Sequence, residues 1–179
     1  MQLFLKEVSK EDKEEILNMI EEIKNSNDTN KFEGISNFKS INKENFNDFL
    51  DEIEKGKNMK LYRPDLVDQS TYLLVDENNH VYGGTNIRHE LNENLLKFGG
   101  NIGYSIRPSE RNKGYATKML ELTLLKCKLL EIEKVLITCR QENIPSAKVI
   151  EKNGGIYENS LYNEENKNTY KRYWIKINK

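Results

Sequence analysis

The most informative stretch of the chain is residues 107–117, which read Arg107-Pro108-Ser109-Glu110-Arg111-Asn112-Lys113-Gly114-Tyr115-Ala116-Thr117. The apolar run 102–106 before it predicts a strand, and the periodic apolar residues after it predict a helix. Gly114 lets the backbone approach a ligand closely. A helix start also offers unpaired N–H groups and about half a positive charge, so the stretch predicts an anion site, and we expect a pyrophosphate. An ordinary strand-to-helix turn with solvated cations explains the spacing equally well.

Two other nucleotide-binding turns do not fit this stretch, because it has neither Gly-x-x-x-x-Gly-Lys-Ser/Thr nor Gly-x-Gly-x-x-Gly. Its Arg-x-x-Gly-x-Ala pattern, from Arg111 to Ala116, resembles the GNAT superfamily of acetyl-coenzyme A-dependent N-acetyltransferases. The resemblance implies that successive backbone amides hold the pyrophosphate of acetyl-CoA, the co-substrate. It assigns coenzyme contacts to the strand end, the turn and the first helical turn: Ile106, Arg107, Arg111, Asn112, Lys113, Gly114, Tyr115, Ala116 and Thr117.

A second pattern lies in residues 143–155. Asn143 is a good N-cap, Pro145 fits a first helical turn and Asn153-Gly154 predicts a helix stop, so capping alone explains these residues. Asn-x-x-Ser, followed after a helix by Glu-Lys-x-Gly, also resembles the last block of the same superfamily. The resemblance implies that Asn143 and Ser146 contact the pantetheine and phosphate region of the coenzyme.

The chain departs from the family pattern at one position. Where many members carry a tyrosine that is thought to protonate the departing thiolate, this chain has Ile150, which cannot do so. The pattern is closer to the branch of ribosomal-protein and related acetyltransferases. Residues 86–104 look like a group of uncharacterised bacterial acetyltransferases, and that resemblance implies no substrate.

The resemblance implies the GNAT fold, an α/β (α+β) arrangement with a single mixed, largely antiparallel sheet splayed between its fourth and fifth strands. We expect about six or seven strands and about four helices. A chain of 179 residues fits one domain, 1–179. The net charge of −1 gives no nucleic-acid signal, and the N-terminus is too short for a signal peptide or membrane span. Cys127 and Cys139 lack metal-ligand spacing, so we expect no metal and a cytoplasmic bacterial protein with free buried thiols.

Periodicity and turn residues predict the remaining elements. The predicted strands are 2–8, 71–76, 80–88, 134–139, 156–158 and 170–177. A capping box at Ser9 and Asp12 opens the first predicted helix, and the others span 43–55, 115–131 and 145–153. Residues 25–40 and 61–69 are expected to be irregular.

Acetyl transfer requires a neutral amine, donors for the developing oxyanion and a proton route to the thiolate. An alkyl ammonium is about one part in a thousand neutral at pH 7, a cost of roughly 4 kcal/mol. The candidate bases are His89, Glu90 and Glu93, each of which also has an ordinary structural explanation. The candidate acids are Tyr104 and Tyr157, both equally suited to the core, and release of the thiolate to solvent needs neither.

In this fold family the acceptor pocket would lie among residues 25–40, 57–70 and 160–168. Acidic residues from Glu11 to Glu22 and from Asp48 to Glu54 favour a cationic acceptor, although most solvated helix faces look the same. The sequence therefore predicts transfer to a primary amine of a small molecule or peptide, with no nucleic-acid or membrane partner and with a homodimer allowed. The alternative is a coenzyme A-binding domain with little or no turnover, which acts as a sensor or scaffold.

Overall fold

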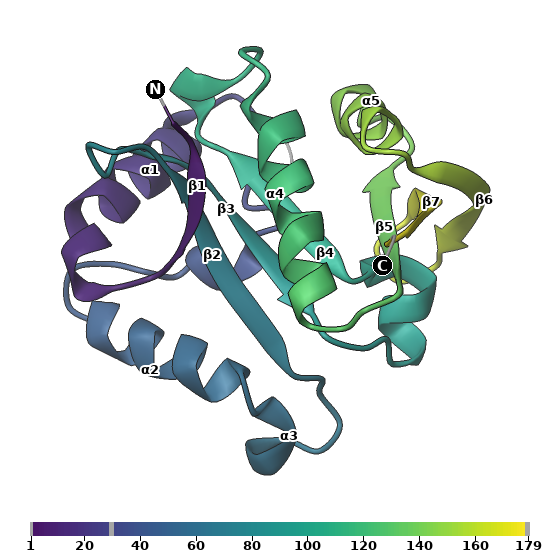
Figure 1. Ribbon diagram of the computed structural model, residues 1–179, viewed down its shortest axis with the longest axis horizontal. Coiled ribbons are helices and arrows are strands. Elements are labelled where there is room, and N and C mark those ends of the chain that lie inside the picture. Colours follow the sequence, from purple (N-terminus) through teal and green to yellow (C-terminus); the bar gives the residue numbers. More distant parts are fainter. Residues whose placement is uncertain (1, 29–30, 178–179) are drawn as a thin grey trace.

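The computed structural model describes residues 2–28 and 31–177 (Figure 1). Its strands are β1 (Phe4–Glu7), β2 (Gln69–Val75), β3 (Val81–Arg88), β4 (Ile102–Ile106), β5 (Lys134–Arg140), β6 (Ile156–Asn163) and β7 (Asn168–Lys176). Its α-helices are α1 (Lys13–Asn25), α2 (Phe46–Gly56), α3 (Met59–Tyr62), α4 (Tyr115–Leu129) and α5 (Ile144–Lys152). Short 3-10 or π-helical turns are η1 (Lys10–Asp12), η2 (Ser36–Phe38), η3 (Leu95–Gly99) and η4 (Pro108–Glu110).

The strands form two hydrogen-bonded groups with antiparallel neighbours, in the orders β1-β2-β3-β4 and β5-β7-β6. The predicted hairpin between β2 and β3 is confirmed, and Asp76 stabilises its turn by accepting the N–H groups of Asn78 and His80. On the next strand pair, Thr85 of β3 lies opposite Tyr104 of β4. This register fixes the position of Tyr104 relative to β3.

The two groups of strands meet at Asn101, which immediately precedes β4. Its N–H donates to the carbonyl of Leu136 on β5 (2.7 Å), and its Oδ1 accepts the N–H of Leu136 (2.8 Å). Its Nδ2 donates to the carbonyl of Arg88 at the end of β3 (3.1 Å). Beyond this point β4 and β5 are not paired, so the expected splay between the fourth and fifth strands is confirmed.

Substitution of Asn101 with alanine should destabilise the protein by about 2 kcal/mol, because the N–H of Leu136 and the carbonyl of Arg88 lose their partners in a buried place. Urea unfolding followed by circular dichroism measures the change. Asn45→Ala is the matched control, since Asn45 also makes two side-chain hydrogen bonds to the backbone but is only partly buried. Equal losses in the two variants would show that Asn101 does not join the strand groups.

Helices cover both faces of the larger strand group (Figure 1). Ile16 and Ile20 of α1 and Phe46 of α2 pack in one cluster with Leu73 of β2. Because alternate residues of a strand face opposite sides, Leu74 of β2 packs on the other face, against α4. Helix α4 and the N-terminal helices α1 and α2 are therefore separated by the sheet.

Some predicted boundaries differ from the structure. The predicted strand 156–158 is too short, because β6 is an edge strand with mostly exposed residues and lacks the apolar alternation that marks a strand. The loop predicted from residue 61 overlaps the short helix α3. Of the segment expected to be irregular, residues 29 and 30 lie outside the described residues. Within the described part of the chain, no helix is both long and apolar enough to cross a membrane.

Candidate functional site

The turn between β4 and α4 carries a row of free backbone donors. Gly114, the N-cap of α4, has φ +86°, and Asn112 also has positive φ. No acceptor among the described residues takes the N–H groups of residues 112–117, and the first bond of α4 runs from the N–H of Lys118 to the carbonyl of Gly114. A Cβ built on Gly114 meets nothing within 4 Å. The turn therefore has both the donors and the open space that a phosphate requires.

Arg111 directly precedes the free N–H groups of this turn. Its Nε donates to the carbonyl of Ile106 (3.1 Å), and its terminal nitrogen forms an ion pair with Asp28 beyond the end of α1 (2.6 Å). The side chain is about one-third exposed, so a bound anion can share it with Asp28. Tyr115, Ala116 and Thr117 follow on the first turn of α4.

Arg107 contacts the protein rather than the open space. Its Nε donates to Glu22 (2.6 Å) and its terminal nitrogen to Glu15 (3.0 Å), both on α1. Glu22 also accepts the N–H of Ser109 in η4 (3.2 Å). Burial alone raises the pKa of Glu22, but its bonds with Arg107 and Ser109 outweigh burial and lower the pKa. The Arg107 side chain thus fixes the turn to α1.

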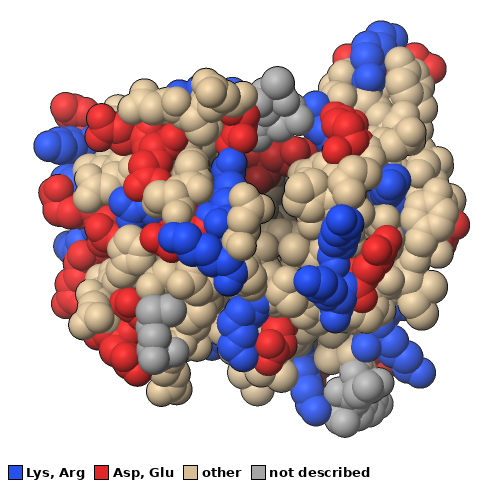
Figure 2. All heavy atoms as spheres, turned by 90° about the horizontal axis from the view of Figure 1, so that it is seen from above, with Lys and Arg blue, Asp and Glu red and all other residues tan. Residues whose placement is uncertain are grey.

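A hollow opens beside the turn. Figure 2 shows it between the part of the molecule that carries α4 and the part that carries α5, with Lys and Arg side chains on both flanks and acidic side chains at its upper end. The exposed basic residues of these two helices and the turn include Lys113, Lys118, Lys148 and Lys152. A mixed surface of this kind favours an anion on the basic side and a cation on the acidic side.

Ser146, from the second sequence pattern, meets the candidate acid Tyr104 across the splay. Asn143 caps α5 as predicted, with its Oδ1 accepting the N–H of Ser146 (3.1 Å). The Ser146 hydroxyl lies 3.0 Å from the hydroxyl of Tyr104 on β4. Burial raises the pKa of Tyr104, so its hydroxyl keeps its proton at neutral pH. Ile150 is fully buried.

The three candidate bases predicted from the sequence lie away from Tyr104. His89 is one residue past the end of β3, where its Nε2 bonds to the Ser70 hydroxyl (2.9 Å), and burial lowers its pKa. It stands four residues along β3 from Thr85, the partner of Tyr104, which is about 13 Å at strand spacing. Glu90 is paired with Lys60. Glu93 is exposed and paired with Lys97 (2.6 Å). The structure does not bring these three residues together with Tyr104.

Two residues that sequence reasoning missed lie at the splay. Glu33, in the turn after α1, accepts a hydrogen bond from the Nε of Arg140, the last residue of β5 (3.0 Å). Neither residue belongs to a motif. The one available signal was that residues 25–40 were expected to line the acceptor pocket.

A separate cavity of about 350 Å³ lies between α2, α3 and the start of β2. Its wall includes the acidic Asp48 and Glu52 together with Asn37 and Thr71. Thr71 accepts hydrogen bonds from Asn37 (3.3 Å) and from the buried Asn86 (3.0 Å). The cavity fits the expected role of residues 57–70 and of the acidic helix face in forming a pocket.

Comparisons with known proteins agree with this geometry. A family model described as "Acetyltransferase (GNAT) domain" matches residues 2–156. A spermidine N-acetyltransferase from Vibrio cholerae, solved with CoA and spermine, superposes with TM-score 0.64 at 18% identity, covering 98% of this chain and 96% of its own. A ribosomal-protein-S5-alanine acetyltransferase from Vibrio fischeri gives TM-score 0.71 at 14% identity, covering 99% and 94%. A GNAT acetyltransferase from Streptococcus pneumoniae gives TM-score 0.67 at 16% identity, covering 99% and 100%. Comparison with curated protein sequences finds no match.

Proposed function

The chain belongs to the GNAT family of acetyltransferases and is an acyltransferase, and we propose that it acetylates a primary amine of a small molecule or peptide. In this proposal the amine attacks the thioester of acetyl-CoA directly while both are bound. The observation that carries it is the turn at Gly114, where six consecutive N–H groups have no acceptor among the described residues and a Cβ built on Gly114 meets nothing within 4 Å. Such a turn at a helix N-terminus suits a pyrophosphate.

The residues present fit a coenzyme that supplies an acetyl thioester. The amides of residues 112–117 would hold its pyrophosphate, with Arg111 and Lys113 adding positive charge. Asn143 and Ser146 flank the splay from α5. The Arg107 side chain acts indirectly, because its bonds with Glu15 and Glu22 fix the turn that presents the amides.

Tyr104 is the proposed proton donor. Ile150 leaves no hydroxyl at the position where many family members have a tyrosine. Tyr104 enters the same splay from β4 instead, and its bond with Ser146 fixes its hydroxyl there. A phenol that stays protonated at neutral pH can give its proton to a departing thiolate. His89 and Glu90 stay predictions for the base, without a contact that links them to Tyr104.

The acidic side chains near the cavity and the hollow support an acceptor amine that carries positive charge. Asp48 and Glu52 border the 350 Å³ cavity, and acidic side chains gather at one end of the hollow in Figure 2. Among the structural neighbours, one was solved with spermine and another is a ribosomal-protein-S5-alanine acetyltransferase. The experiment therefore includes both a polyamine and a peptide with an N-terminal alanine.

The test is release of free thiol from acetyl-CoA, measured with each of three probe amines: spermine, a peptide with an N-terminal alanine, and n-butylamine. Thiol release that depends on one of these amines, with the acetylated product seen by mass spectrometry, supports the proposal. Ile150 favours the alternative of a coenzyme-binding domain with little turnover. Binding of acetyl-CoA by calorimetry without thiol release for any probe would support that alternative and contradict the proposal.

A further inference from the structure

Glu33 lies in a tightly fixed turn between α1 and η2. Its neighbours Phe32 and Ile35 are buried in the core, and the N–H of Ile35 bonds to the carbonyl of Phe32 (3.0 Å). Phe32 has φ +63°, a backbone conformation that an aromatic residue rarely adopts. Strain of this kind persists only where the surrounding structure imposes it, and it gathers at functional sites.

The next residue places this turn against β4. Gly34 has φ +84°, and a Cβ built on it would overlap the carbonyl oxygen of Tyr104. The carbonyl oxygen of Gly34 in turn occupies the space that a Cβ on Gly103 would need. The backbone beside Glu33 therefore touches β4 at Tyr104, whose side chain reaches Ser146 on α5.

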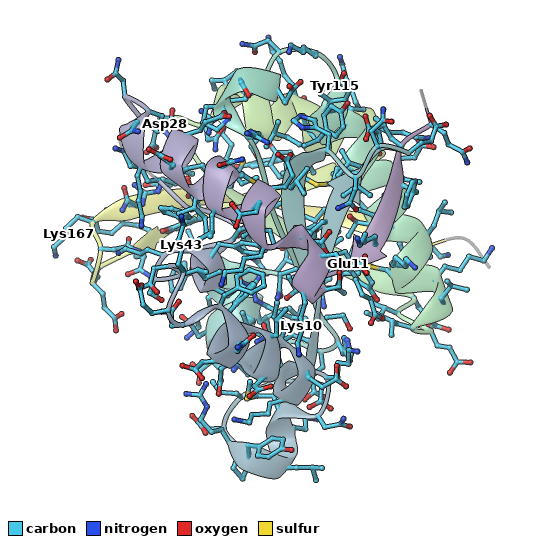
Figure 3. The ribbon with its side chains drawn as sticks, turned by 90° about the vertical axis from the view of Figure 1, so that its left-hand side faces the viewer. Lys10, Glu11, Asp28, Lys43, Tyr115 and Lys167 are labelled. Carbon is cyan, nitrogen blue, oxygen red and sulfur yellow. The ribbon has the colours of Figure 1, made fainter. Side chains whose placement is uncertain are left out.

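The Glu33 carboxylate then reaches β5. It accepts the Nε–H of Arg140, which also donates to Asn168 at the start of β7 (3.1 Å). Glu33 thus spans the splay from β4 to the end of β5. Figure 3 shows that Asp28, just beyond α1, and Lys167, in the turn before β7, lie on the same side of the molecule. One-third of the Glu33 side chain stays exposed, so an acceptor can reach it.

Glu33 differs electrostatically from the other carboxyl groups whose pKa is clearly moved. Burial raises the pKa of Glu33 although the Arg140 guanidinium opposes the shift. The other shifted carboxyl groups all have lowered pKa values: Asp12, Glu15, Glu22, Asp28, Asp76 and Glu93. A carboxylate whose pKa lies closer to neutral pH is a better proton acceptor.

We propose that Glu33 is the residue that takes the proton from the acceptor ammonium, a role that rests on the proposed amine acetylation. Glu33 accepts one N–H proton, which leaves a neutral amine and a carboxylic acid that later releases its proton to solvent. The amine nitrogen forms a bond to the acetyl carbon as the carbon–sulfur bond breaks. The second proton of the nitrogen passes to solvent as the amide forms, and Tyr104 gives its proton to the departing sulfur and then takes one back from solvent.

Other carboxylates near the splay fit this role less well. Asp28 is paired with Arg111 at 2.6 Å, and its pKa is lowered. Glu142 also lies near Arg140 but is 63% exposed and 3.9 Å away. Glu158 is paired with Arg172.

The test compares Glu33→Gln with Glu142→Gln as the matched control beside the same arginine. The rate is kcat/KM for thiol release with whichever of spermine, the alanine peptide or n-butylamine the unchanged enzyme uses best. At pH 7 we expect Glu33→Gln to lower kcat/KM about a hundredfold and Glu142→Gln to leave kcat/KM within about twofold of the unchanged enzyme. Calorimetry with coenzyme A should give the same affinity for all three proteins.

The pH profile separates a proton acceptor from a structural residue. The unchanged enzyme deprotonates the bound ammonium itself, so its kcat/KM should be level across neutral pH. Glu33→Gln can use only the free amine, so its rate should rise about tenfold per pH unit up to the pKa of the amine, which is about 10 for an alkyl amine and about 8 for the peptide. The difference in kcat/KM between the unchanged enzyme and Glu33→Gln should therefore shrink as pH rises.

Three results would overturn the proposal. A Glu33→Gln enzyme with a normal rate, or with the same deficit at every pH, excludes Glu33 as the proton acceptor while amine acetylation stands. No turnover by the unchanged enzyme with any probe removes both proposals together. Should Glu33→Gln fail to bind coenzyme A, Glu33→Ala, which also lacks a carboxylate, replaces it, and an unaltered pH profile and rate in that variant contradict the role.

Discussion

Replacing Gly114 with glutamate is expected to weaken coenzyme A binding at least about a thousandfold. The new carboxylate would stand where the amides of residues 112–117 face open space, and would repel a pyrophosphate there. Loss of two charge-assisted hydrogen bonds costs about 4 kcal/mol, which is close to three factors of ten in the dissociation constant. Isothermal titration calorimetry with coenzyme A measures the change.

Gly154→Glu is the matched control for this variant. Gly154 also has φ +86°, and a Cβ built on it likewise meets nothing within 4 Å, but it follows the C-terminal end of α5 rather than opening a helix. Both variants force a side chain into left-handed backbone, so both should lose about 1 kcal/mol of stability. Only Gly114→Glu should lose coenzyme binding. Normal binding by Gly114→Glu would place the coenzyme elsewhere and contradict the proposed function.

Replacing Arg107 with methionine is expected to destabilise the protein by about 3 kcal/mol. The side chain is 9% exposed and joins Glu15 and Glu22 of α1 to the end of β4, so its loss removes the guanidinium partner of two partly buried carboxylates, which keep only His80 and single backbone N–H groups. Methionine fills much of the same volume, which limits any cavity. The midpoint of urea unfolding at pH 7 measures the effect.

Lys57→Met is the control for this change. Lys57 also bridges two carboxylates, Glu7 and Glu54, but those groups are well exposed, so we expect a loss below about 1 kcal/mol. A comparable loss in the two variants would mean that Arg107 does not fix the turn.

The pH dependence of the Arg107 effect has a definite sign. The pKa values of Glu15 and Glu22 are lowered in the folded protein, where bonds with Arg107 and the backbone outweigh burial. Their contribution is therefore complete above the ordinary glutamate pKa of about 4.3, and is lost as pH falls through the lowered values. The difference between the unchanged protein and Arg107→Met should be largest near pH 7 and should narrow below about pH 4. A difference that stays constant with pH would show that packing, not charge, explains it.

The coenzyme turn could be predicted in detail because its parts are adjacent in the chain. A strand, a glycine and a helix start within residues 102–117 are each determined by local periodicity and backbone freedom. The N-cap at Asn143 was predictable for the same reason. Their coenzyme contacts stay predictions that the Gly114 variants test.

The base could not be predicted in the same way. His89 and Glu90 were chosen because their residue types and their place in the chain fit proton transfer, but His89 lies about 13 Å along the strand direction from Thr85, the partner of Tyr104, and Glu90 is one residue further. Glu33 lies in an irregular segment that shows no periodicity. Its meeting with Arg140 joins residues more than a hundred positions apart in the sequence.

The sequence by itself was enough to identify the family by resemblance, and the resemblance implied the splayed α/β fold. The strand, glycine and helix start of the turn were predictable because they depend on neighbouring residues and on repeating apolar positions. Only the tertiary structure decided that Asn101 joins the two strand groups, that Arg107 contacts α1 and that Glu33 lies across the splay from β4 to β5. These contacts depend on how distant segments pack around two cores, and local sequence does not encode the distances between them.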